Sequence, residues 1–184
     1  MIVAAVGKNA TGKDYFLEYV SKKYDIPMIS IGDIVRELAT KEGLEHTREN
    51  LHAVSHKYMS TYGQDFFPKE VIRRIKEKGY KNILISGIRP LSDVVMMKNE
   101  FGKKFILVDV KISDDLVRFE RMKVRASARD PLTIEQFREY DANEEKLFHT
   151  SETEKLADFT ILNDGTADDF HKAIDAFCAE HLFK

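Results

Sequence analysis

The chain is short of the residues and segments that define several classes of protein. Among its 184 residues there is one cysteine, Cys178, so no disulfide can form within the chain. That cysteine falls on the apolar side of the last predicted helix, where we expect it to pack in the core. We also find no internal repeat and no low-complexity tract. These absences exclude a disulfide scaffold and a repeat architecture.

Charge excess and long apolar runs are missing as well. The net charge is -2, so the chain has no general basic field and nucleic acid is not expected as its main partner. No apolar run approaches the ~20 residues of a membrane span, and the N-terminus lacks the basic start and cleavage site of a signal peptide. We therefore expect a cytoplasmic protein without a membrane partner. A hydrophobic content of 43% is enough for a sizeable core in a single domain, residues 1–184.

One motif near the start organises the rest of the chain. Residues 7–14 read GKNATGKD, between the apolar run 1–6 and the amphipathic segment 15–20. This order of strand, glycine-rich turn and helix is the context of a phosphate-binding loop, G-x-x-x-x-G-K. Glycines allow a tight turn whose N–H groups hold phosphate oxygens, and the lysine ammonium binds the outer phosphates. The residues predicted to bind the nucleotide here are Gly7, Lys8, Asn9, Ala10, Thr11, Gly12, Lys13 and Asp14.

Apolar runs alternate with amphipathic segments along the remaining sequence. Strands are predicted at 2–6, 28–31, 83–85, 105–110 and 157–162. Helices are predicted between them, beginning near residues 12, 32, 47, 66, 91, 114, 133 and 166, with polar material at 141–156. Strands separated by helices indicate a parallel sheet covered on both faces. The predicted fold is three-layer α/β of the P-loop NTP hydrolase type, with its ligand at the carboxyl ends of five parallel strands.

Three further segments at that edge of the sheet carry charged residues. Ser30–Glu37 follows the second strand, Ser86–Arg89 follows the third, and residues 114–129 form an arginine-rich helix. Phosphoryl transfer needs positive charge, because negative charge spreads over the oxygens of the transferred group. Arginine suits that task through its planar, bidentate guanidinium. The basic run could instead be an ordinary solvated helix face.

Together, in this order, these segments resemble the nucleoside monophosphate kinase group. The loop, the Ile-Gly-Asp-x-x-Arg element at 31–36, the Gly-Ile-Arg turn at 87–89 and the arginine-rich segment carry the likeness. The closing run 157–166 resembles the end of dephospho-coenzyme A kinases and of a related archaeal-type group. The resemblance covers nearly the whole chain. It implies a helical acceptor-binding insertion at 32–79 and a lid at 114–140.

The resemblance also implies roles for individual residues. Asp33 and Arg36 would face the acceptor, and Arg89 would bind the acceptor's phosphate. Arg121 and Arg125 would close over the donor phosphates as lid arginines. Asn163 and Gly165 would lie near the donor's adenine.

Two positions depart from adenylate kinases. Asp14 stands where those enzymes have a magnesium-binding hydroxyl, and Ser86 stands where they have an aspartate that helps hold the ion. Since magnesium prefers oxygen ligands, we expect Asp14 to hold Mg²⁺ directly or through water. The Gly-Lys-Asp loop and the run 85–93 are also similar to animal-type phosphomevalonate kinases, and the loop to phage-type deoxynucleotide kinases. The identity of the acceptor therefore stays open.

The sequence thus predicts an ATP- and Mg²⁺-dependent kinase. Its acceptor would be a small nucleotide-like molecule, such as a nucleoside or deoxynucleoside monophosphate or dephospho-coenzyme A. The residues predicted to act in transfer are Lys13, Asp33, Arg89, Arg121 and Arg125. Asp33 could orient an acceptor hydroxyl, cap a helix, or do both. A slowly hydrolysing P-loop ATPase that acts as a switch is the main alternative, and a role in ribosome or RNA maturation is a weaker one. The sequence leaves the oligomeric state open.

Overall fold

The computed structural model describes residues 1–125 and 133–183. The predicted lid, 114–140, therefore lies partly outside the described residues. The strands are β1 (Ile2–Val6), β2 (Met28–Ser30), β3 (Ile83–Ser86), β4 (Phe105–Lys111) and β5 (Phe159–Leu162). The α-helices are α1 (Lys13–Tyr24), α2 (Ile31–Lys41), α3 (Arg48–Tyr62), α4 (Phe66–Lys78), α5 (Leu91–Phe101), α6 (Asp115–Arg125), α7 (Ile134–Phe148), α8 (Thr150–Glu154) and α9 (Ala167–Phe177). A 3₁₀ turn, Gly102–Lys104, precedes β4, and a π-helical turn, Cys178–Leu182, follows α9.

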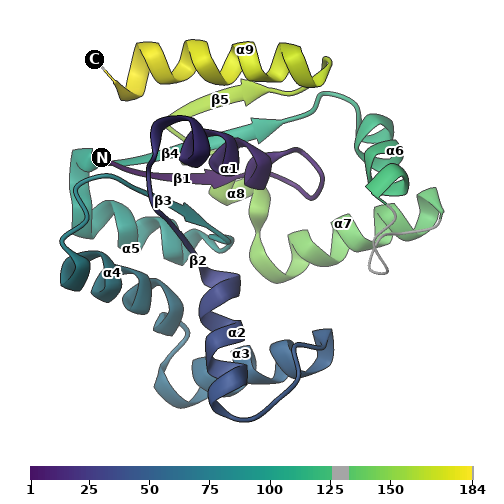
Figure 1. Ribbon diagram of the computed structural model, residues 1–184. Helices are drawn as coiled ribbons and strands as arrows, with labels where there is room; N and C mark the ends of the chain where they lie inside the picture. The colour runs from purple at the N-terminus through teal and green to yellow at the C-terminus, as the bar shows by residue number, and fades with distance from the viewer. Residues whose placement is uncertain (126–132, 184) are drawn as a thin grey trace.

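The strands form one parallel sheet in the order β2-β3-β1-β4-β5. The strand that carries the phosphate-loop motif is therefore central, between β3 and β4. Its last residue, Val6, pairs with Asp109 of β4. The carboxyl ends of the strands point to the side of the molecule where α6 and α7 lie (Figure 1). The predicted fold class, one parallel sheet covered on both faces, is thus confirmed. The predicted ligand edge is the side on which the strands end.

Alternate residues of each central strand pack on opposite faces of the sheet. Val3 and Ala5 contact a cluster built from α1 and α9, which includes Phe16 and Ile174. Ile2, Ala4 and Val6 contact a second cluster built from α2, α4 and α5. Burial on both faces explains why the strand is a continuous apolar run rather than an alternating one. Cys178 lies in the first cluster, as predicted, and burial raises its pKa to about 11.

Helices α2 and α3 project from the carboxyl end of β2, toward the bottom of Figure 1. Ser30 caps α2 by accepting a hydrogen bond from the Asp33 amide, so the capping role considered for Asp33 was wrong. Thr47 caps α3 and Thr133 caps α7, at the residues where the sequence predicts these helices to begin. The sequence analysis assigned no helix or strand to the polar material at 141–156, and the structure places the end of α7, to Phe148, and then α8 there. An exposed polar surface hides the helical period in that segment.

Candidate active site

The loop between β1 and α1 has backbone angles that explain its glycines. Gly7 has φ +136°, and a Cβ there would lie 2.4 Å from the carbonyl oxygen of Val110 in the neighbouring strand β4. Gly12 has φ +97°, and a Cβ there would lie 2.6 Å from the Asn163 amide nitrogen. Both positions combine a left-handed backbone with close packing, so each excludes any side chain. The two glycines of the motif are thus required by geometry on opposite ends of the loop.

Hydrogen bonds within the loop hold its shape. Thr11 is buried, and its hydroxyl donates to the Lys8 carbonyl at 3.0 Å. The Lys13 ammonium donates to the same carbonyl at 3.3 Å. Ala10 adopts a left-handed conformation, with φ +63°. A non-glycine residue in that region is strained, and such strain is concentrated where a backbone is preset for a ligand.

Two side chains from distant elements brace the same loop. The Asn163 amide, after β5, donates to the Thr11 carbonyl at 2.8 Å and is buried. The guanidinium of Arg118, on α6, donates to the Asn9 carbonyl at 3.0 Å. Both contacts use carbonyl groups and so occupy none of the loop N–H groups, although the Thr11 N–H donates to the Lys8 carbonyl at 3.4 Å. Other N–H groups of the loop would be the donors for a phosphate-type ligand. Asn163, predicted near adenine, therefore lies against the loop backbone.

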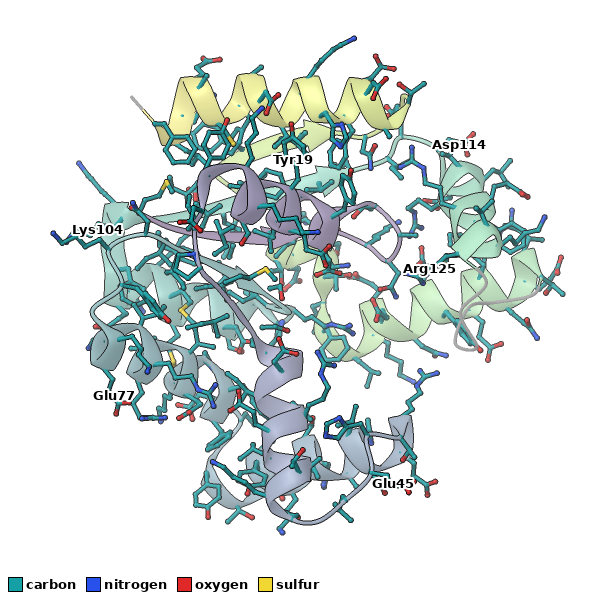
Figure 2. All side chains as sticks on the ribbon, in the orientation of Figure 1. Tyr19, Glu45, Glu77, Lys104, Asp114 and Arg125 are labelled. Atoms are coloured by element: carbon teal, nitrogen blue, oxygen red, sulfur yellow. The ribbon has the colours of Figure 1, made fainter. Side chains whose placement is uncertain are left out.

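A hollow of about 230 Å³ opens on one side of Lys13. Its lining combines the start of α1 with two arginines of α6, Arg121 and Arg125; Arg125 is labelled in Figure 2. Arg121 also donates to the Gly165 carbonyl at 3.2 Å. The sequence placed the loop lysine, both predicted lid arginines and Gly165 at the donor side. The lysine and both arginines line this hollow, and Gly165 contacts it only through Arg121.

Burial lowers the pKa of the Lys13 ammonium. The negative carboxylates of Asp14 and Glu144 oppose that shift, while the positive Arg89 and Arg125 add to it. The site thus concentrates cations around one lysine and offsets part of their repulsion with carboxylates. An anionic ligand such as a triphosphate would relieve that repulsion further.

On its other side Lys13 lines a second, much smaller cavity, of about 10 Å³. Arg89 lies here, directly after β3, and donates from Nη1 to Glu144 Oε1 at 2.8 Å. The guanidinium of Arg89 also stacks over the Phe148 ring, 5.4 Å from its centroid. The remaining lining residues are Val6, Gly7, Ile88, Thr150 and Thr153. Helix α7 thus supplies two side chains that fix Arg89 beside the loop.

Asp33 and Arg36 lie on α2, next to the turn after β3. Gly87 has φ +88° and packs against Ile31, where a Cβ would lie 3.2 Å from the Ile31 Cβ. Arg36 donates from Nε to Asp33 Oδ1 at 3.1 Å, and both side chains are substantially exposed. Neither residue belongs to the linings of the two hollows around Lys13. The structure thus brings Arg89 to the loop lysine but leaves the pair on α2 further out.

The residues present suit a magnesium ion at the donor side. The Asp14 carboxylate is exposed in the first turn of α1 and lines the same hollow as Gly12 and Lys13. Magnesium commonly binds one or two protein carboxylates and keeps several waters, so a single exposed carboxylate beside the phosphate loop fits. Ser86, at the end of β3, is buried. Among the residues that the structure describes, no group of three His, Cys, Asp or Glu side chains forms a dedicated metal cage.

Sequence reasoning missed three residues at this edge. Arg118 was noted only as part of a basic run, yet its side chain is 1% exposed and pairs with Asp141 of α7. Asp109 is fully buried at the end of β4, 2.9 Å from the Lys111 ammonium, and burial raises the pKa of its carboxyl group. Its signal in the sequence is a single carboxylate inside an apolar strand. Glu144 had no comparable signal, because it lies among many charged residues of an exposed helix.

The fold and this loop define the class of protein. Residues 6–138 match the family described as AAA domain. The matched range includes the phosphate loop and the arginine-rich helix α6. The chain therefore belongs to this family and has a P-loop NTPase-type domain, and the phosphate-loop motif at Gly7–Asp14 lies within the matched residues.

More particularly, the chain belongs to the UPF0200 family. It is 32% identical to the UPF0200 protein of Thermococcus onnurineus, over 98% of this chain and 100% of that protein. It is 35% identical to the UPF0200/UPF0201 protein of Archaeoglobus fulgidus over 94% of this chain, but spans only 53% of that longer protein.

Solved structures place the fold among small-molecule kinases. Shikimate kinase from Aquifex aeolicus superposes with a TM-score of 0.59, at 19% identity, covering 100% of this chain and 99% of that one. Dephospho-CoA kinase from Campylobacter jejuni also gives 0.59, at 16% identity, covering 97% and 96%. At such identities the likeness shows the kinase-type fold alone. Among the described residues, no helix is both long and apolar enough to cross a membrane.

Proposed function

We propose that the protein is a kinase that transfers the terminal phosphoryl group of ATP to a small acceptor. The observation that carries this proposal is that Lys13 lines two hollows at once. One contains Asp14, Arg121 and Arg125, which suit the donor phosphates. The other contains Arg89 and Glu144, on the side expected for the acceptor. A switch that only hydrolyses a nucleotide needs the first hollow and has no use for the second.

The chain's own residues can do most of the work by position and charge. The loop backbone and Lys13 would hold the donor phosphates, and Arg121 and Arg125 would neutralise charge that develops on the transferred group. Asp14 would hold the magnesium ion, which supplies further neutralisation of the phosphates. The second cavity is too small for an acceptor, so the helices around it must separate to admit one and close again for transfer.

The identity of the acceptor is to be found by screening a panel of candidate molecules. The sequence favours a nucleotide-like acceptor, with Arg36 and Arg89 near it. The related folds extend the panel, since proteins of this shape include a shikimate kinase, a gluconokinase and a dephospho-CoA kinase. The panel should therefore hold nucleoside and deoxynucleoside monophosphates, dephospho-coenzyme A, phosphomevalonate, shikimate and gluconate.

The test measures ADP release from ATP, alone and with each panel member. We expect at least one acceptor to raise the rate well above hydrolysis by water. Lys13→Ala should lower that rate by at least about 100-fold, because it removes a cation from the transferred phosphoryl group. Lys22→Ala, an exposed lysine in the last turn of the same helix, is the matched control and should leave the rate unchanged. Turnover that no acceptor stimulates would favour the ATPase switch instead.

A further inference from the structure

Glu144 is a carboxylate that lines the same small cavity as two cations of the site, Lys13 and Arg89. It lies on α7, and its Oε1 accepts from Arg89 Nη1 at 2.8 Å. It lines the same small cavity as Lys13, and its charge is close enough to raise the pKa of the Lys13 ammonium. This carboxylate offsets part of the repulsion among the cations around Lys13, but it would also repel a bound phosphate. Phosphate binding alone therefore does not account for its position.

Arg89 has a second contact that holds it in place, so Glu144 is not needed for that purpose alone. Phe148, one turn along α7, already stacks on the guanidinium and holds it from the same side. The hydrogen bond occupies one nitrogen of Arg89 and one oxygen of Glu144. A bond of this kind sets the direction of both groups. The arrangement resembles that of a base held in place by a neighbour more than that of a simple surface ion pair.

Asp33, the carboxylate that the sequence favours for this task, is less well placed. It is paired with Arg36 on its own helix, and its side chain is 60% exposed. Glu144 is 25% exposed and lies directly beside the loop lysine. Because Lys13 contacts the outer phosphates of the donor in a loop of this type, a carboxylate in the cavity on the Arg89 side of Lys13 would lie near the transferred group, on the side proposed for the acceptor.

We infer that Glu144 is a catalytic residue that binds the hydroxyl group of the acceptor and removes its proton, and that the phosphorylated atom is therefore a hydroxyl oxygen. This inference rests on the proposed kinase function and specifies its acceptor. The acceptor oxygen forms a bond to the terminal phosphorus of ATP, while the bond from that phosphorus to the bridging oxygen breaks. ADP leaves with that electron pair, and the hydroxyl proton passes to the Glu144 carboxylate and then to water.

The groups that face Glu144 come from three elements besides its own helix. They are Lys13 of α1, Arg89 after β3, and Thr150 and Thr153 of α8, which line the same cavity. The Thr150 hydroxyl donates to Glu145 and the Thr153 hydroxyl to the His149 carbonyl. Arg89 then keeps its positioning role and binds a second polar group of the acceptor or of the transferred phosphoryl.

The experiment compares variants at one position with the acceptor that gives the fastest turnover, and with water. Glu144→Gln keeps the shape and a hydrogen-bond acceptor for Arg89 but removes the base. We expect kcat to fall about 10²–10⁴-fold, with KM for ATP within about twofold of wild type. Glu144→Asp, which retains a carboxylate, should recover part of the loss. Glu139→Gln, an exposed carboxylate on the same helix, is the control and should match wild type.

Two results would overturn the inference while leaving the kinase function intact. One is a Glu144→Gln variant with a kcat close to that of wild type or above it. The other is a wild-type enzyme that phosphorylates monophosphates or phosphomevalonate faster than every hydroxyl acceptor in the panel. A wild-type protein that binds ATP but shows no turnover with water or any acceptor would refute both proposals together.

Discussion

Replacing Arg118 by methionine tests how helix α6 holds the loop between β1 and α1. The guanidinium is buried between α6 and α7, where it donates to Asp115 at 2.8 Å, to Asp141 and to the Asn9 carbonyl. It also stacks on the Phe137 ring, 4.8 Å from its centroid. Methionine fills a similar volume and keeps the apolar contact, so the substitution removes mainly the charge and the hydrogen bonds.

The exposure of each ion-pair partner determines how much free energy of unfolding the Arg118→Met substitution should cost. Breaking a buried ion pair by removing one partner costs about 3–5 kcal/mol, because a buried charge is left uncompensated. Asp141 is 19% exposed, so its carboxylate would remain mostly buried, whereas Asp115 is 59% exposed and water can replace its partner. We therefore expect the free energy of unfolding to fall by about 3 kcal/mol, the lower end of that range. For a chain of this size that lowers Tm by about 6–12 °C.

The assay is equilibrium unfolding in urea, with ATP binding measured by calorimetry. Arg118→Met should also weaken ATP binding, because the Asn9 carbonyl loses its brace. Arg73→Met is the matched control, since Arg73 pairs with Glu70 and Glu77 but is 51% exposed. Such exposed pairs contribute less than about 1 kcal/mol. Equal losses in the two variants, or a loss below about 1 kcal/mol for Arg118→Met, would refute the reasoning.

Two further predictions concern other carboxylates. Burial, with a smaller effect of Asp65, raises the pKa of Asp93 to about 7. The contribution of Asp93 to the free energy of unfolding is therefore fully present below about pH 4, which is near the pKa of an aspartate in the unfolded chain. It is lost as the pH rises through about 7, by up to about 4 kcal/mol. Asp93→Asn should remove that loss, so its stability advantage over wild type should grow between pH 5 and pH 8 in urea titrations; a constant difference would contradict this. Asp14→Ser should shift the magnesium titration of ATP turnover more than it changes nucleotide affinity, and an unchanged titration would exclude Asp14 as the ligand.

Much of the fold could be predicted because its signals are local. The apolar run before Gly7 and the motif that follows it place the central strand, the loop and the first helix. Thr47 and Thr133 cap their helices as their side chains indicate. The failures are also local in origin. Ser30 caps α2 in place of Asp33, and the charged surface of α7 concealed its last two turns.

The candidate site was predicted only where a residue's role follows from its place next to a strand or a motif. Lys13, Arg89, Arg121 and Arg125 meet around the loop as the ordered motifs suggest. Asn163 was singled out, but its contact with the loop backbone was not foreseen.

The sequence alone determined the class of protein, because a phosphate loop needs two glycines and a lysine at fixed spacing and the hydrophobic pattern dictates the sheet around it. The tertiary structure alone decided which charged side chains serve that loop. Glu144 and Arg118 lie more than 100 residues from it in the chain, and their neighbours are equally charged. Only the packing of α6 and α7 against the carboxyl edge of the sheet distinguishes the buried charges from the solvated ones. That distinction depends on burial and distance, which no local pattern of charges encodes.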